Sequence, residues 1–141
     1  MTTLFTKIIN GEIPGRFVWK DDDVVAFLTI APLTPGHTLV VPRQEIEHWL
    51  RADEGTLAKV MAVAQTIGTA QEQAFGAERV GVLLEGYEVP HLHVHVWPTQ
   101  SPADFDVKRV DLAPDPAAMD EAAETLRSAL RDAGHGAFVP A

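Results

Sequence analysis

Hydrophobic and polar positions along the chain follow two periods, one typical of β-strands and one typical of α-helices. Short segments rich in β-branched and aromatic residues predict four strands, over residues 16–20, 24–30, 37–41 and 80–84. The charged run 21–23 is typical of a solvated hairpin turn between the first two. Short turns between consecutive strands favour an antiparallel sheet.

A long helix is predicted between Asp53, which can cap its start, and Gly76, which can end it. Its apolar stripe is typical of a core face or a subunit contact and comprises Leu57, Val60, Met61, Ala64, Ile67, Ala74 and Phe75. Shorter helices are predicted over residues 4–9 and 45–50.

A last helix is predicted after the loop 99–114. It begins at Asp115-Pro116, a cap followed by a first-turn proline, and ends at Gly134. Its apolar side comprises Met119, Ala122, Ala123, Leu126 and Leu130. The pattern as a whole predicts an α+β domain, in which helices back an antiparallel sheet.

Residues 88–98 carry the most unusual pattern, because three of the chain's 6 histidines alternate with aliphatic residues. The alternating residues are His91, Leu92, His93, Val94, His95 and Val96. A period of two predicts a strand with the three imidazoles on one face and the aliphatic side chains on the other. Bulky polar rings that titrate near neutrality fill a core poorly, so this face is a candidate functional site.

Two chemistries use histidines in this way. On a straight strand the backbone positions of His91 and His95 would lie about 13 Å apart, whereas a zinc ion binds each ligand nitrogen at about 2.0–2.1 Å. Two of the histidines could therefore share a metal with ligands from elsewhere, but not easily all three. Nucleophilic attack on phosphorus by His93 uses all three histidines, and we favour it.

Composition narrows the class of partner. With 141 residues, 46% of them hydrophobic, the chain is long enough for one domain with a proper core. A formal charge of −9 argues against nucleic acid or an anionic membrane as the main partner, although a local pocket can still hold a small phosphorylated ligand. Cysteine is absent, and we find no signal-peptide pattern and no apolar run of membrane-spanning length. We expect a cytoplasmic protein.

Three segments together resemble the histidine triad (HIT) family of nucleotide hydrolases and transferases. They are FTKIINGEIP at residues 5–14, PGHTLVVP at 35–42 and VPHLHVH at 89–95. The resemblance defines residues 1–98 as a HIT-like domain and leaves 99–141 as a C-terminal loop and helix extension packed on the same domain. It implies a five-stranded antiparallel sheet with a long helix, paired across a two-fold axis in a homodimer.

The resemblance also implies roles for the histidines. His93 matches the nucleophile that attacks an α-phosphorus and forms a nucleotidyl-histidine intermediate. His95 would contact phosphate oxygens and assist the leaving group, while His91 and His37 would order and polarise the cluster. No cofactor is implied. The positions that match the nucleotide-binding residues are Ile13, Phe27, Leu28, Thr29, Ile30 and Glu88.

Three departures from the family pattern affect metal and ribose binding. Many members have a zinc-binding Cys-x-x-Cys pair near the start, where this chain has Thr3 and Thr6. A histidine that often assists that metal is replaced by Glu45, so we expect no structural zinc. Thr29 stands where the family usually places an aspartate for the ribose hydroxyls, and it lacks the charge and paired acceptors of a carboxylate.

The loop before the triad departs further. It is shortened to Glu85-Gly86-Tyr87-Glu88, with Tyr87 in the place of a glutamine. Glu88 stands where a small hydroxyl residue often touches phosphate. A carboxylate there repels phosphate unless it is protonated, paired or turned away, so the substrate is unusual or the activity is weak.

The leading hypothesis is a nucleotidyl hydrolase or transferase that acts on a purine, AMP-like nucleotide conjugate. The alternatives are a protein of the same fold that binds a nucleotide with little turnover, and a metal-dependent enzyme that uses two of the triad histidines.

Overall fold

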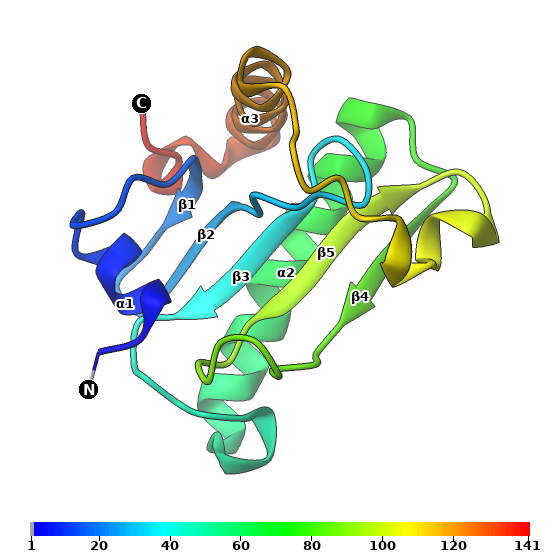
Figure 1. Cartoon of the computed structure of the whole chain (residues 1–141). Coiled ribbons are helices and arrows are strands. Elements are labelled where there is room, and N and C mark those ends of the chain that lie inside the picture. Colours follow the sequence, from blue (N-terminus) through cyan, green and yellow to red (C-terminus); the bar gives the residue numbers. More distant parts are fainter. Residues whose placement is uncertain (1) are drawn as a thin grey trace.

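The computed structural model describes residues 2–141, which form a five-stranded antiparallel sheet with helices packed against it (Figure 1). The strand order is β1-β2-β3-β5-β4, and every neighbouring pair is antiparallel. The strands are β1 (Phe17–Lys20), β2 (Val24–Leu28), β3 (Thr38–Pro42), β4 (Arg79–Leu83) and β5 (Val94–Thr99). The predicted α+β class and antiparallel sheet are therefore confirmed, whereas the two-fold dimer stays a prediction.

Three α-helices accompany the sheet: α1 (Leu4–Ile9), α2 (Glu54–Phe75) and α3 (Pro116–Leu130). The Asp53 carboxylate accepts the Thr56 amide at the start of α2, and Gly76 ends the helix with φ +62°, where glycine carries no Cβ penalty. Asp115 caps α3 in the same way, with Pro116 in the first turn. No helix within residues 2–141 has the length and apolar character needed to cross a membrane.

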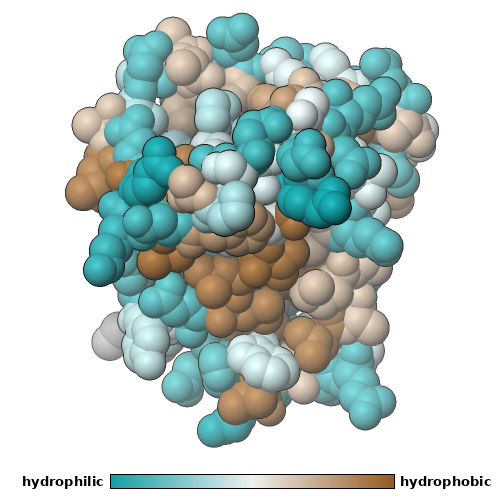
Figure 2. Space-filling view, turned by 90° about the vertical axis from the view of Figure 1, so that its right-hand side faces the viewer, coloured by the Kyte–Doolittle hydropathy of each residue, from teal (hydrophilic) through white to brown (hydrophobic). Residues whose placement is uncertain are grey.

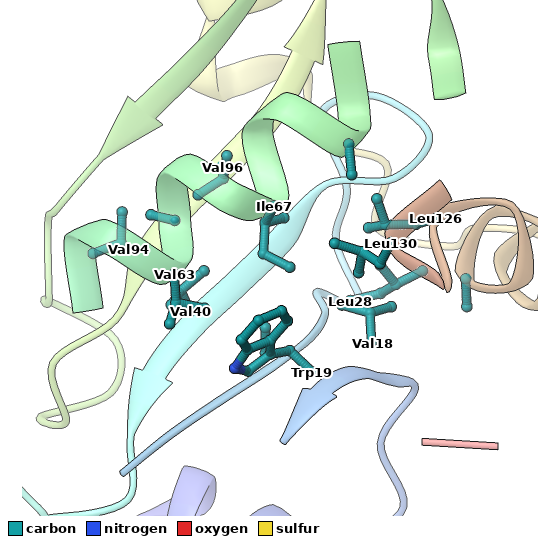
Figure 3. Packing of buried hydrophobic residues seen from close by; sticks show 14 of the residues in the cluster. Val18, Trp19, Leu28, Val40, Val63, Ile67, Val94, Val96, Leu126 and Leu130 are labelled. Atoms are coloured by element: carbon teal, nitrogen blue, oxygen red, sulfur yellow. The ribbon is translucent and has the colours of Figure 1, made fainter. Parts of the chain in front are cut away.

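The helices α2 and α3 cover one face of the sheet, which we call the helix face. The main core lies there, with Ile67 of α2 directed at the sheet and Leu126 and Leu130 of α3 beside Val18 and Leu28 (Figure 3). All five apolar residues predicted for the last helix are buried in this core. Helix α3 thus packs against the same sheet as α2.

The short helix α1 packs against the opposite face, which we call the histidine face. A second, smaller cluster lies there, in which Phe5 and Ile8 of α1 contact side chains of β2 and β3. Alternation along the strands separates the two clusters: Val40 belongs to the helix face, and its neighbours Leu39 and Val41 to the histidine face.

The predicted histidine strand is wrong at its start. Strand β5 begins at Val94, so only His95 of the triad lies in it. Residues 91–93 instead bend: the amide of His91 donates to the Val89 carbonyl at 2.8 Å, and His93 Nδ1 donates to the His91 carbonyl at 2.7 Å. Because these local bonds use groups that a strand ladder would pair, the backbone leaves the strand conformation here.

Two helix predictions also fail in detail. Residues 45–50 are not a helix; only a 3₁₀ turn, Trp49–Arg51, forms nearby, because Ile46 is occupied as a backbone partner of Leu92. Helix α3 ends at Leu130, and Gly134, with φ +95°, lies in a following turn.

Candidate active site

Four histidines meet on the histidine face. His95 lies in β5 and is paired with Leu39 of β3 and Leu83 of β4. His37 directly precedes β3, His93 directly precedes β5, and His91 lies two residues before His93. Of the four rings, His91 is fully buried, His37 and His93 are almost so, and His95 is partly exposed. The structure therefore brings together the four histidines that the sequence singles out.

His37 and His95 form a hydrogen-bonded pair, with His37 Nε2 2.9 Å from His95 Nδ1. The Leu33 amide donates to His37 Nδ1 at 3.0 Å, so that nitrogen is an acceptor and the proton of the neutral ring sits on Nε2. His37 Nε2 therefore donates to His95 Nδ1. The proton of a neutral His95 is left on Nε2, the nitrogen directed away from His37.

His93 is held in the opposite tautomer. A carbonyl oxygen can only accept, so the 2.7 Å contact with the His91 carbonyl places the proton of His93 on Nδ1. Nε2 then carries a lone pair, and it makes no hydrogen bond within residues 2–141 although it is not sealed from solvent. Phe5 packs edge-on against the ring, with centroids 4.8 Å apart, and fixes its plane.

His91 has partners at both nitrogens. Nε2 donates to the Pro42 carbonyl at 2.7 Å, and Nδ1 lies 2.7 Å from the Thr3 hydroxyl. With the proton on Nε2, the hydroxyl of Thr3 donates to Nδ1. The ring thus ties the start of α1 and the end of β3 to the segment that carries His93.

Thr3, Thr6 and Glu45 surround this end of His91. The Glu45 carboxylate accepts from the Thr3 amide and from the Thr6 hydroxyl, both at 2.7 Å. These bonds hold the pKa of Glu45 below its usual range. Hydrogen bonds therefore join the three residues that replace the family's metal ligands.

This donor set does not fit zinc. Zinc in proteins takes thiolate, imidazole or carboxylate ligands, whereas two of the four groups here are neutral hydroxyls that already donate to protein acceptors. Within residues 2–141 no group of three or more His, Asp or Glu side chains is placed to hold a metal ion. The absence of bound zinc remains a prediction.

Burial keeps the cluster uncharged at neutral pH. Desolvation lowers the pKa of His37 to about 3 and that of His95 to about 4, with a further lowering from the neighbouring histidine in each case. Burial also lowers the pKa of His91 and of His93. At His93 the His91 carbonyl and the charges of Glu88 and Glu85 oppose this shift.

The predicted nucleotide-binding residues are divided by the fold. Phe27 lies in the small cluster on the histidine face, with the partly buried Ile13 packed against it. Leu28 points the other way, into the core beneath α3, because it is the next residue of the strand (Figure 3). The structure thus does not bring Leu28 to the histidines.

The other three predicted positions lie in loops. Thr29 is nearly buried, and its hydroxyl accepts the Ala31 amide at 3.2 Å. Ile30 is 78% exposed and has no core role. Glu88 is exposed in the loop before the triad, where its charge acts on His93.

Sequence reasoning missed two aromatic residues of the site. Phe5 contacts both His91 and His93, and Trp97 packs against His37 with centroids 5.4 Å apart. A signal existed for Trp97, which stands two residues after His95 and so shares its face. Phe5 lies at least 86 residues from both histidines in the sequence, and no local sequence pattern predicts a contact over that separation.

Comparison with known proteins agrees with this geometry. A sequence profile described as the HIT domain matches residues 10–101. An uncharacterized HIT-like protein from Borreliella burgdorferi is 38% identical over 113 residues, which are 75% of this chain and 81% of that protein. A purine nucleoside phosphoramidase from Escherichia coli is 31% identical over 102 residues, 67% of this chain and 84% of that protein.

A solved structure extends the likeness to nearly the whole chain. The zinc-bound histidine triad family protein from Mycobacterium smegmatis superposes with a TM-score of 0.81 at 26% identity, covering 96% of this chain and 98% of that one. The profile match spans more than half of the chain, and the relatives match across the segments that carry the histidines. The chain therefore belongs to the HIT, or histidine triad, family.

Proposed function

We propose that this protein is a nucleotidyl hydrolase or transferase that attacks the α-phosphorus of a purine nucleotide conjugate and forms an intermediate on His93. The observation that carries the proposal is the state of the His93 ring. Its Nδ1 proton is bound by the His91 carbonyl, which leaves the Nε2 lone pair free for an electrophile. Burial keeps the ring neutral, and only the neutral ring is nucleophilic.

The His37–His95 pair supplies the second requirement. With His37 donating to His95 Nδ1, the proton of the neutral His95 ring lies on Nε2, the nitrogen that is not bonded to His37. The two rings His93 and His95 lie with centroids 5.0 Å apart, which suits contact with one phosphoryl group. His95 would donate to a phosphoryl oxygen or to the leaving atom as negative charge develops there.

The proposed reaction has two displacements. In the first, His93 Nε2 forms a bond to phosphorus and the bond to the leaving group breaks. In the second, water attacks phosphorus and releases His93 in its neutral form. One water is consumed overall: its hydroxyl ends on phosphorus, and its remaining proton ends on the leaving group. With an acceptor other than water, the same intermediate leads to transfer.

The substrate class rests on the relatives and on the chemistry of the site. The Escherichia coli relative is a purine nucleoside phosphoramidase, so a purine nucleoside phosphoramidate is the first substrate to test. Ile13, which is partly buried and packs against the small cluster that contains Phe27, offers an apolar surface for a nucleoside. Glu88 and Glu85 place negative charge near His93, which favours slow turnover of an anionic phosphate.

We also propose that the working form is a homodimer. The side of the molecule on the right of Figure 1, where β4 forms the sheet edge, carries a contiguous hydrophobic surface (Figure 2). Met61 and Val82 are exposed there and line a hollow of about 670 Å³ between α2 and β4. A second copy would cover this apolar surface. Sedimentation at micromolar concentration should show twice 15.3 kDa, and a species of 15.3 kDa alone would contradict the dimer.

The direct test replaces the nucleophile. His93→Asn should abolish turnover of an adenosine phosphoramidate while AMP binding, measured by calorimetry, changes little, because covalent catalysis acts on the transition state. His135→Asn is the matched control, since His135 packs against Trp19 far from the cluster. Rapid acid quench and intact mass should detect one nucleotidyl group on the wild-type chain and none on His93→Asn. Unchanged turnover in His93→Asn would refute the assignment.

One alternative has specific support. A HIT-fold protein that binds a nucleotide with little turnover is favoured by Thr29, whose hydroxyl already accepts the Ala31 amide, and by the charge of Glu88 near His93. It predicts that wild type binds AMP but forms no nucleotidyl intermediate, and that His93→Asn keeps the ligand affinity of wild type.

A further inference from the structure

Gln71 is a fully buried polar residue on the helix face, at a point where its neighbours are apolar. It lies in α2, its exposed fraction is 0%, and Ile67 one turn earlier belongs to the main core. Its side-chain amide nitrogen donates to the Gly36 carbonyl at 2.9 Å and to the Val96 carbonyl at 3.0 Å. Both acceptors belong to the backbone of the sheet that carries the histidines.

The orientation of this amide is fixed by its partners. Carbonyl oxygens can only accept, so the NH₂ group must face Gly36 and Val96 and the amide oxygen must point away. That oxygen, Gln71 Oε1, is buried and has no hydrogen-bond partner within residues 2–141. An apolar side chain of the same size would avoid this desolvation cost, so packing alone does not explain the amide.

The two carbonyls flank the catalytic pair in the sequence. Gly36 directly precedes His37, and Val96 directly follows His95. One NH₂ group therefore links the two backbone segments from behind the sheet, in addition to the ladder pairing of Thr38 with Val96. On the other side of the sheet the rings of His37 and His95 meet at 2.9 Å.

Other contacts hold the turn at residues 34–37, which precedes β3. The Thr38 hydroxyl also donates to the Gly36 carbonyl, at 2.8 Å. Gly36 has φ +90°, and a Cβ there would come within 2.5 Å of the Phe75 ring of α2. The turn before His37 thus rests directly on the last two turns of α2. The turn reaches β5 through Gln71 and through the Thr34 hydroxyl, which donates to the Pro98 carbonyl at 2.6 Å.

We propose that Gln71 is a positioning residue, which holds His37 and His95 at hydrogen-bonding distance from the opposite face of the sheet. Its catalytic consequence rests on the function proposed above, because only then does the His37–His95 pair act on a phosphoryl group. Loss of the amide lets the turn 34–37 shift relative to β5. The hydrogen bond between the two rings lengthens, and the proton of His95 Nε2 loses its defined direction.

The test compares three variants of the full chain. Gln71→Met keeps length and fills the space with a flexible apolar group, but donates nothing. Gln73→Met makes the same change on the exposed side of α2. Ile67→Val removes one methylene from the buried side without touching a hydrogen bond, and so controls for lost stability. All assays are run below the melting temperature of every variant.

The kinetic readout separates positioning from stability. Gln71→Met should lower kcat on the adenosine phosphoramidate by about tenfold to a hundredfold with little change in KM, because a small misplacement of the pair acts on the transition state. Both controls should keep kcat within about twofold of wild type, because neither residue is hydrogen-bonded to the segments that carry His37 and His95. A kcat for Gln71→Met equal to that of Ile67→Val would overturn the proposal.

A spectroscopic readout tests the positioning without relying on turnover. Long-range ¹H–¹⁵N spectra of the histidine rings at pH 7 report the tautomer of each ring. In wild type His37 and His95 should each show one tautomer, with the proton on Nε2. Gln71→Met should mix the tautomers of these two rings and leave His93 and His135 unchanged. If Gln71→Met leaves the tautomers of His37 and His95 unaltered, the positioning role is refuted, whether or not the wild-type protein is active. If Gln71→Met alters the tautomers but wild type is inactive, only the proposed function is refuted.

Discussion

The two faces of the central sheet are built from alternate residues of the same strands, yet different interactions hold them in place. On the helix face Val94 and Val96 pack with Ile67 in a continuous apolar core. On the histidine face His95, the residue between them, depends on one hydrogen bond at 2.9 Å. Apolar packing has no direction, whereas an imidazole functions only in one tautomer and one orientation. The apolar core of the helix face therefore supplies stability, and the hydrogen bonds of the histidine face, with Gln71 behind them, supply geometry.

The difference extends to what each face can tolerate. A core residue can change shape at a cost in free energy and still leave the fold intact. Each histidine of the cluster instead has a specific partner, such as the Pro42 carbonyl for His91 and the Leu33 amide for His37. Substitutions of apolar core residues and of the cluster histidines should consequently separate stability from activity.

The largest effect is expected on the helix face. Ile67→Ala removes a fully buried side chain and should lower the free energy of unfolding by about 2–5 kcal/mol, measured by urea denaturation. Below the melting temperature its kcat should stay close to wild type. His93→Asn should show the reverse, with little change in stability and no turnover. A large loss of kcat in folded Ile67→Ala would break the separation between the faces.

The next effect concerns rate on the histidine face. Thr29→Asp with Glu88→Ser restores a carboxylate for the ribose and removes a negative charge near His93. Each charge-assisted hydrogen bond contributes about 1.5–3 kcal/mol, so kcat/KM on an adenosine phosphoramidate should rise about tenfold to a hundredfold. Asp22→Ser is a control that removes an equally exposed charge at the hairpin turn. No gain from the double variant would mean that Glu88 points away from the phosphate or that the true substrate is not an ordinary nucleotide.

The third prediction uses pH to weaken the histidine face alone. The folded pKa values of His37, about 3, and of His95, about 4, lie below the usual 6.5. As pH falls from 6.5 towards 5, the unfolded chain binds protons that the folded chain does not, so stability falls. Each histidine contributes up to about 1.4 kcal/mol per pH unit.

The control for this prediction removes one titrating group. His37→Gln should flatten the decline of unfolding free energy between pH 6.5 and 5, a range that lies above most carboxylate titrations. Equal slopes in wild type and His37→Gln would show that His37 is not buried in its neutral form.

The smallest effect is expected from metal. Because hydroxyls and Glu45 occupy the places of zinc ligands around His91, a chelator should not shift the melting temperature, and elemental analysis should find no stoichiometric zinc. Thr3→Cys, Thr6→Cys and Glu45→His in one chain should, by contrast, create a zinc site with His91 Nδ1. One tightly held zinc per wild-type chain would contradict the hydrogen-bonded cluster.

Much of the architecture is encoded locally and could be predicted from the sequence. The caps Asp53 and Asp115 and the αL glycine Gly76 act within a few residues, so α2 and the start of α3 were predicted to within a residue. Alternation at residues 16–20 and short segments rich in β-branched and aromatic residues at 24–30 and 37–41 predicted β1 to β3, because such side chains suit the strand backbone. The identity of the four histidines followed from residue type and from the family resemblance.

The tertiary structure decided how those histidines work. Partners from other parts of the fold determine the bend at residues 91–93, the tautomers of the rings and the position of His37. His91 is bonded to Pro42 and Thr3, while Leu33 bonds to His37 and Gln71 bonds to the turn before it. A periodic pattern reports the average environment of a face, since burial acts through area. Hydrogen bonds depend on distance and direction between single atoms, so only the folded chain, which brings Thr3 to His91 and Gln71 to the turn before His37, determines them.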